Sequence, residues 1–274
     1  MIGRQLLRAF APSAVLFLLL GSSLHHRLCG GASRIGQAPK MMLWAWERPE
    51  RLSFLDSSST GVAYLAETIY PKGNGFLVHP RLQPLEVPTN AYLEAVVRIE
   101  IDRKSSWCLS DKELDRLAAE VVKVTKQPRV RALQIDFDAR ESERSLYKEL
   151  LKKVRVLLPN QLPLSITALS SWCMGDKWLE DAPVDEIVPM LFSMGAGREE
   201  SLDFIRTSDT KNLSYFQKCF GLSVRDSEPA AELSTRIKLA DTRLYFFSAR
   251  PWNPTSVQHA QDEVRIWESN SSNQ

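Results

Sequence analysis

Two aspartates separated by a single residue, Asp136 and Asp138, are the side chains of this sequence best placed for chemistry. They close the apolar segment VRALQIDFD at 130–138, which predicts a buried strand. Side chains alternate along a strand, so both carboxyl groups project from one face. Two carboxyl groups held close together do not both ionise easily, so one can keep a proton for general acid catalysis. The alternative use of such a pair is to bind calcium or magnesium through its oxygens.

Eight short apolar segments predict strands, and amphipathic or turn-rich stretches separate them. The predicted strands cover 41–46, 61–70, 92–101, 130–138, 164–169, 187–192, 219–224 and 244–249. The predicted helices cover 110–127, 141–157, 199–207 and 233–241. Eight strands with intervening helices in about 230 residues predict an α/β fold of the TIM-type (β/α)8 barrel class.

The first half of the predicted barrel is less regular than the second. Segment 71–88 is rich in Pro, Gly and Asn and predicts a long loop or a hairpin in place of a helix. An incomplete barrel and an open doubly wound sheet are therefore the alternatives to a complete barrel.

Polar side chains occupy one face of three neighbouring predicted strands. Arg98 and Glu100 share the polar face of one strand, and Thr167 lies on the polar face of another. Buried charges are costly unless they are paired, so we expect Arg98 near Asp136 or Glu100. An internal ion network without chemistry is the alternative for Arg98 and Glu100. Asp138 ends its strand at the carboxyl side, where TIM-barrel active sites lie.

Aromatic residues follow several of the predicted strands. Trp46 ends the first strand, Trp172 follows the fifth and Trp252 follows the eighth. Aromatic faces at a barrel mouth suit stacking against the CH faces of sugar rings. The alternative is that these residues pack in the core or in loops.

The charge distribution argues against a nucleic-acid partner. The formal net charge of the 274 residues is +2, but the first forty residues contain five basic side chains and no acidic one. The remaining body has 30 basic and 33 acidic residues. Binding to nucleic acid would need a basic face, which this composition does not favour.

The N-terminal segment predicts export. Arg4 and Arg8 precede the apolar run AVLFLLL at 14–20, and Gly21, Ser22 and Ser23 follow it. The run is shorter than the roughly 20 residues that span a membrane. An uncleaved anchor and lipidation at Cys29 are the alternatives. We expect a periplasmic protein, or one attached to the outer side of the inner membrane through this segment only.

The sequence predicts three regions: an export signal or anchor plus linker at 1–35, a single α/β barrel domain at 36–267, and a disordered tail at 268–274 rich in Ser and Asn. The cysteines lack CxxC spacing, and we predict neither a metal nor a cofactor. Cys108 and Cys173 either form a disulfide or remain buried free thiols.

Four segments, MLWAWERPE, LQIDFDARESER, PLSITALSSWC and VDEIVPMLFSMG, resemble the bacterial family catalogued as domain of unknown function 3142. The resemblance runs from about Met41 to Trp252. It implies an exported protein, in some cases a lipoprotein, and brings no established activity.

More distantly, the sequence is similar to the chitinase-like glycoside hydrolases of family eighteen. Their barrels carry a DxxDxDxE motif at the end of the fourth strand, an M-x-Y motif on the sixth and a Trp after the eighth. In this chain the second and third acids fall on Asp136 and Asp138. The segment Met190-Leu191-Phe192 takes the place of the strand-six motif, and Trp252 takes the last position.

Two departures from that family concern its acids. Leu133 stands where the first acid would be, and Arg140 stands where the glutamate proton donor belongs. The resemblance implies hydrolysis of an N-acetyl sugar, but Arg140 removes the general acid of that mechanism. Glu141, one residue further on, and Glu47, after the first strand, are the candidates to replace it.

The leading hypothesis is an exported glycoside hydrolase-like barrel that acts on an envelope or environmental polysaccharide. The candidate catalytic residues are Asp138, Asp136, Glu47 and Glu141. The candidate substrate-binding residues are Trp172, Trp252, Arg98, Glu100, Met190, Phe192 and Trp46. The alternatives are a non-catalytic glycan-binding barrel and an envelope interaction protein whose mouth is closed by segment 71–88.

Overall fold

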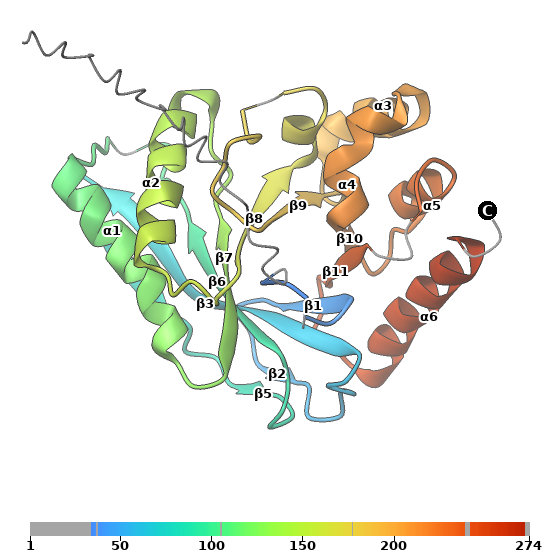
Figure 1. Ribbon diagram of the computed structural model, residues 1–274. Helices are drawn as coiled ribbons and strands as arrows, with labels where there is room; N and C mark the ends of the chain where they lie inside the picture. The colour runs from blue at the N-terminus through green and yellow to red at the C-terminus, as the bar shows by residue number, and fades with distance from the viewer. Residues whose placement is uncertain (1–33, 37, 105, 177, 239–241, 272–274) are drawn as a thin grey trace, which may run out of the picture. The chain divides into compact units, whose positions relative to one another are not determined.

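The computed structural model describes residues 34–36, 38–104, 106–176, 178–238 and 242–271 (Figure 1). The predicted export signal and Cys29 lie outside these residues. No helix in the described part of the chain is long and apolar enough to span a membrane.

Eight parallel strands close into a barrel. In chain order they are β1 (Met41–Ala45), β3 (Thr60–Lys72), β6 (Leu93–Ile99), β7 (Val130–Asp136), β8 (Leu164–Leu169), β9 (Glu186–Met190), β10 (Cys219–Ser223) and β11 (Arg243–Phe247). Each strand pairs with the next, and β1 pairs with both β3 and β11, which closes the ring. The predicted TIM-type barrel is confirmed, and the incomplete barrel and the open sheet are wrong.

No helix covers the first two crossovers of the barrel. They contain instead the short strands β2 (Glu50–Arg51), β4 (Gly75–Pro80) and β5 (Leu85–Glu86). β4 turns back antiparallel to the long strand β3, and Gly73 in the turn between them has a positive φ of 55°. Segment 71–88 thus forms a hairpin, which was one of the two structures predicted for it. Its Pro, Gly and Asn residues favour turns over a helix.

Helices cover the remaining strands on the outside of the barrel (Figure 1). The α-helices are α1 (Asp111–Lys123), α2 (Arg144–Leu157), α3 (Arg198–Thr207), α4 (Ser214–Lys218), α5 (Glu228–Ser234) and α6 (Pro254–Ser271). The 3-10 turns are η1 (Val124–Lys126), η2 (Glu141–Glu143), η3 (Ser170–Cys173), η4 (Gly195–Gly197) and η5 (Thr210–Leu213). Ser110 caps α1 by accepting a hydrogen bond from the Glu113 backbone N–H, as its sequence position predicts.

The sequence prediction was wrong near the C-terminus. The helix expected over 233–241 is α5, which starts earlier, near Pro229, and ends at Ser234. The tail expected to be disordered from Glu268 continues α6 as far as Ser271. This last helix is held by burial of Val257, Ala260 and Trp267 against the barrel, which the Ser- and Asn-rich composition of the chain end conceals.

The three cysteines in the described part of the chain are free. Of the two alternatives for Cys108 and Cys173, the free thiols are confirmed and the disulfide is wrong; Cys173 is buried as expected, but Cys108 is exposed. Cys219 is also buried, inside the barrel. Burial raises the pKa of the Cys173 and Cys219 thiols, which keeps them protonated and unreactive.

Glu67 on β3 is a buried carboxyl group beneath α1. It is 6% exposed, and its Oε1 accepts no hydrogen bond from the described residues. Burial, with a smaller contribution from Glu120, raises its pKa from 4.5 to about 7, and Lys123 opposes this rise. The folded protein holds this proton more tightly than the unfolded chain does. Protonated Glu67 therefore makes its full contribution to the free energy of unfolding below pH 4.5, and this contribution is lost as the pH rises to about 7.

We therefore predict that Glu67→Gln stabilises the protein at pH 8 relative to wild type by on the order of 1 to 2 kcal/mol, with little gain at pH 4.5. Chemical denaturation at both pH values measures this difference. Glu86→Gln, at an exposed site, is the control and should show no such dependence. An equal effect of Glu67→Gln at both pH values would contradict the assignment.

Candidate functional site

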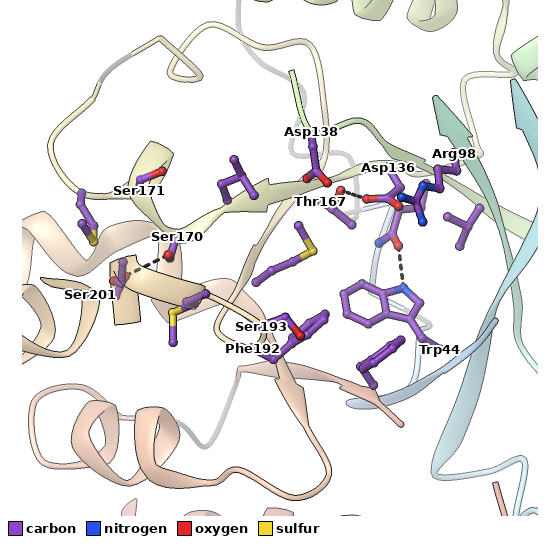
Figure 2. Close-up of a pocket in the computed structure, with 18 of the residues that line it drawn as sticks. Trp44, Arg98, Asp136, Asp138, Thr167, Ser170, Ser171, Phe192, Ser193 and Ser201 are labelled. Atoms are coloured by element: carbon purple, nitrogen blue, oxygen red, sulfur yellow. Dashed lines mark hydrogen bonds between the residues drawn. The ribbon is translucent and has the colours of Figure 1, made fainter. Parts of the chain in front are cut away.

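A cavity of about 500 Å³ opens at the carboxyl end of the barrel strands (Figure 2). Residues at the ends of β1, β6, β7, β8, β9 and β11 line it, together with the start of α3. This is the end at which TIM-barrel enzymes carry their active sites. The cavity contains the two aspartates from which the sequence prediction started.

Asp136 lies on the wall formed by β6, β7 and β8. The Thr167 hydroxyl donates a 2.7 Å hydrogen bond to Asp136 Oδ1, and Arg98 is its neighbour in the β6–β7 pairing. Burial raises the pKa of Asp136 to about 6 and the nearby Asp138 charge adds to the rise, while the Thr167 bond and Arg98 oppose it. Asp136 therefore titrates close to neutral pH.

Asp138 lies just beyond the end of β7 and is more exposed than Asp136. Burial of its carboxyl group raises its pKa, and the charges of Arg98 and Arg103 oppose the rise. Arg103 also donates a hydrogen bond of 3.2 Å to the Asp138 backbone carbonyl, which fixes this turn. Figure 2 shows Asp138, Asp136 and Arg98 on one side of the cavity.

Arg98 has the surroundings that the sequence predicted. Its Nε lies 3.3 Å from Glu100 Oε2, and its guanidinium lies 5.2 Å from the centre of the Trp46 ring. Its charge also lowers the pKa of both aspartates. Arg98 thus links the carboxylates to an aromatic side chain of the cavity.

Six of the eleven candidate residues line the cavity: Asp136, Asp138, Arg98, Met190, Phe192 and Trp46. Glu100 contacts Arg98 from outside the lining. Glu47 and Glu141 are exposed and do not line it, so neither replaces the missing glutamate. They lie beyond the ends of β1 and β7, where strand alternation no longer predicts the direction of a side chain.

The two tryptophans expected to stack on sugars are in the core, and this part of the prediction was wrong. Trp252 is 4% exposed, and its indole N–H donates to the Trp44 carbonyl at 2.8 Å. Trp172 is 3% exposed and packs edge-to-face on Trp178 with 4.9 Å between ring centres. Protein covers both rings, so neither presents a face to the cavity.

Other aromatic rings form the apolar wall of the cavity. Phe192 stacks on Phe247 with 5.0 Å between ring centres and contacts Trp44 edge-on at 5.5 Å. Gly221 on β10 makes this packing feasible, because a Cβ there would come within 3.0 Å of the Trp44 ring. Trp44 and Phe247 were not predicted as lining residues, although both lie on barrel strands and alternation could have placed them.

Hydroxyl groups gather at another part of the cavity, away from the aspartates (Figure 2). Ser170 and Ser171 follow β8, Ser193 follows β9, and Ser201 lies on α3. The Ser170 and Ser201 hydroxyls are 2.9 Å apart, and Ser201 donates to the Gly197 carbonyl. These residues and Glu200 belong to the segments that follow β8 and β9, where only the general rule that such connections carry function would have indicated them.

A directed chain of hydrogen bonds supports the floor of the cavity. The Trp44 indole N–H donates to Gln134 Oε1 at 2.8 Å, and Gln134 Nε2 donates to the Ser165 hydroxyl at 3.1 Å. Ser165 in turn donates to Glu94 Oε1 at 2.6 Å. An indole is only a donor, so the direction of every step is fixed. This chain fixes the amide orientation of Gln134 and holds the Trp44 ring in place.

Deeper in the barrel this series of hydrogen bonds ends at two glutamates that contact the same tyrosine. The Tyr245 hydroxyl lies 3.0 Å from Glu94 Oε2 and 2.7 Å from Glu186 Oε2. One hydroxyl proton cannot serve both contacts fully, so a proton on one glutamate would supply the second hydrogen bond. Arg243 pairs with Glu186 at 3.3 Å, and burial raises the pKa of Glu94 to about 7. Glu94 is therefore the protonated partner below about pH 7.

Among the described residues no group of three or more His, Cys, Asp or Glu side chains is arranged to hold a metal ion. The polar side chains that line the cavity are two aspartates of raised pKa, one arginine, one glutamine, one exposed glutamate and several hydroxyls. Such a set can bind a polyhydroxylated ligand and exchange protons with it.

Comparison with solved structures shows distant similarity to TIM-barrel glycoside hydrolases. A candidate chitinase A of Streptomyces coelicolor matches with a TM-score of 0.53 and 8% identity over 84% of this chain and 98% of that one. A GH113 β-mannanase of Alicyclobacillus acidocaldarius matches with a TM-score of 0.49 and 9% identity over 85% of this chain and 97% of that one. At 8% identity, the likeness to the Streptomyces coelicolor structure shows the fold alone.

The spore cortex-lytic enzyme SleL of Bacillus cereus also matches, with a TM-score of 0.42 and 15% identity over 67% of this chain. The match spans 51% of the length of that enzyme. No protein-family model and no curated protein matches this chain. Membership of the family of domain of unknown function 3142 therefore stays a prediction from the four segments quoted above.

The Thr167 hydrogen bond gives a testable prediction. It stabilises the charged form of Asp136, so Thr167→Val should raise the pKa of Asp136 further above 6, by on the order of one unit. A pH titration of the carboxyl carbons by NMR on ¹³C-labelled protein measures this. Thr125→Val, which removes a hydroxyl bonded to the Val122 carbonyl, is the control. An unchanged Asp136 titration in Thr167→Val would show that the bond does not govern this carboxyl.

Proposed function

We propose that this protein binds a polysaccharide at the mouth of its barrel and hydrolyses a glycosidic bond there. Asp138 is the acid/base group, and Asp136 and Arg98, which lie behind it, influence its protonation. The observation that carries this proposal is the position of two carboxyl groups of raised pKa in an aromatic-walled cavity at the carboxyl end of the strands.

The walls of the cavity suit a sugar. Trp46, Phe192 and Phe247 are half-buried and offer apolar surface to the CH faces of a pyranose ring. Arg98 and the serine hydroxyls offer hydrogen bonds to its hydroxyl groups. A cavity with apolar walls and a few convergent polar groups is the common form of a small-molecule site.

The aspartates suit proton transfer to a leaving sugar oxygen. A carboxyl group whose pKa is raised toward the working pH can hold a proton and deliver it in the transition state. Asp138 is the more exposed of the two and lies nearer the mouth, so we assign it the contact with the glycosidic oxygen. Asp136 lies behind it, and its charge state changes near pH 6.

The alternative is a glycan-binding protein without catalysis, and one observation favours it. Arg140 is exposed, lies outside the cavity lining and occupies the position of the proton donor in the chitinase-like family. An envelope interaction protein with a mouth closed by segment 71–88 has less support. No residue of that segment is among the described residues that line the cavity.

We also propose that the protein is exported, with its barrel in the periplasm or anchored outside the inner membrane. Support comes from Arg4, Arg8 and the apolar run at 14–20 in the sequence. Cell fractionation of the full-length chain, with mass spectrometry of its N-terminus, tests this. A chain found intact in the cytosolic fraction would contradict it.

A hydrolysis and binding screen of the full chain tests the proposed function. We would use chitin oligosaccharides, β-1,4-mannan and purified peptidoglycan, with reducing-end release and calorimetry as readouts. Asp138→Asn should lower hydrolysis at least about 100-fold, because it removes the transferable proton, while binding stays within a few-fold of wild type. Wild-type activity should also fall as the pH rises above the Asp138 pKa.

Asp181→Asn is the matched control, because Asp181 is exposed and does not line the cavity. It should leave hydrolysis unchanged. Full activity of Asp138→Asn would remove Asp138 from the mechanism. Binding that survives Asp138→Asn, with no product released even by wild type, would instead support the glycan-binding alternative.

A further inference from the structure

A third carboxyl group lines the cavity. Glu200 belongs to the first turn of α3, in the segment that follows β9, and lines the same space as Asp136 and Asp138. The two aspartates come from β7, so β8 and its loop lie between them and Glu200 in the barrel. Figure 2 shows Asp138 and Ser201, the neighbour of Glu200, at separate parts of the cavity, with Ser170 and Ser171 nearer Ser201.

The surroundings of Glu200 differ from those of Asp138. Glu200 is exposed, and its side chain has no ion pair or hydrogen bond with the described residues. The arginines of the same helix are engaged elsewhere. Arg198 pairs with Asp226 and Glu228, and Arg206 pairs with Glu228 and Glu232. Glu200 is therefore open to water, while burial of the Asp138 carboxyl group raises the pKa of Asp138.

Glycoside hydrolysis by two carboxyl groups needs the two groups to have different surroundings, as Glu200 and Asp138 do. One group donates a proton to the leaving oxygen, and the other acts as a carboxylate from another side of the sugar. Asp136 and Asp138 project from the same strand and reach the ligand from one wall. Glu200 is the remaining carboxylate among the described residues that line the cavity.

We propose that Glu200 is the second catalytic carboxylate, the general base that activates water; this rests on the proposed hydrolase function. The Glu200 carboxylate takes a proton from a water molecule as the water oxygen forms its bond to the anomeric carbon. The bond from that carbon to the glycosidic oxygen breaks, and its electron pair stays on the leaving oxygen. Asp138 gives its proton to that oxygen, and both carboxyl groups return to their initial states by exchange with water.

The neighbouring Glu199 provides a matched control. It lies in the same turn of α3 and is exposed, but it does not line the cavity. Glu199→Gln and Glu200→Gln therefore remove the same charge from the same helix end. Only Glu200→Gln removes a carboxylate from the cavity.

The experiment measures hydrolysis by both variants with whichever of chitin oligosaccharide, β-1,4-mannan or peptidoglycan wild type cleaves. Glu200→Gln should lower turnover by about 10²- to 10⁴-fold with binding of the same sugar preserved, and Glu199→Gln should match wild type. The pH profile distinguishes catalysis from folding. The activity of wild type should fall at both acidic and alkaline pH. In Glu200→Gln the fall at acidic pH should be absent from the remaining activity. Azide should restore turnover to Glu200→Ala.

Three results would overturn the assignment, and they are distinguishable. Equal turnover of Glu200→Gln and wild type would exclude Glu200 and leave the proposed function standing. Loss of turnover together with loss of sugar binding, without rescue of Glu200→Ala by azide, would show a structural role. Absence of hydrolysis by wild type on all three substrates would overturn the proposed function and this assignment together.

Discussion

The pairing of β1 with both β3 and β11 is the constraint on which the rest of this structure depends. It turns a row of parallel strands into a closed ring, and all eight strand ends then meet around one mouth. The first two crossovers have no covering helix, yet the ring still closes, because backbone hydrogen bonds and not helices join the strands. Closure brings the ends of β1, β7 and β9 to one cavity although they are far apart in sequence.

Closure also encloses an interior that is polar in places. Gln134, Ser165, Glu94, Tyr245, Glu186 and Arg243 form a continuous set of hydrogen bonds inside the barrel. Every member has at least one partner, which offsets the cost of burying polar groups, although the buried Arg243 Nε bonds to none of the described residues. The arrangement needs one shared proton, so it couples the floor of the cavity to the protonation of Glu94. The Trp44 ring, held by Gln134, is where this interior meets the cavity.

At the mouth, position rather than residue type decides what each carboxyl group can do. Asp136 is bonded to Thr167 and titrates near neutral pH, Asp138 lies at the edge of the buried wall, and Glu200 faces water. The same functional group thus occurs in three environments within one cavity. The acid–base chemistry that we propose for this cavity would use carboxyl groups in different surroundings of this kind.

The eight strands, the barrel class and the inward direction of Asp136, Asp138 and Arg98 could be predicted from the sequence, because alternation and apolar periodicity are local properties of a strand. It could not place groups whose direction depends on loops. Glu47 and Glu141 turn away from the cavity, Trp172 and Trp252 are buried, and Glu200 enters from α3. These positions follow from the folded structure, since barrel closure and loop packing are set by contacts between residues distant in the chain.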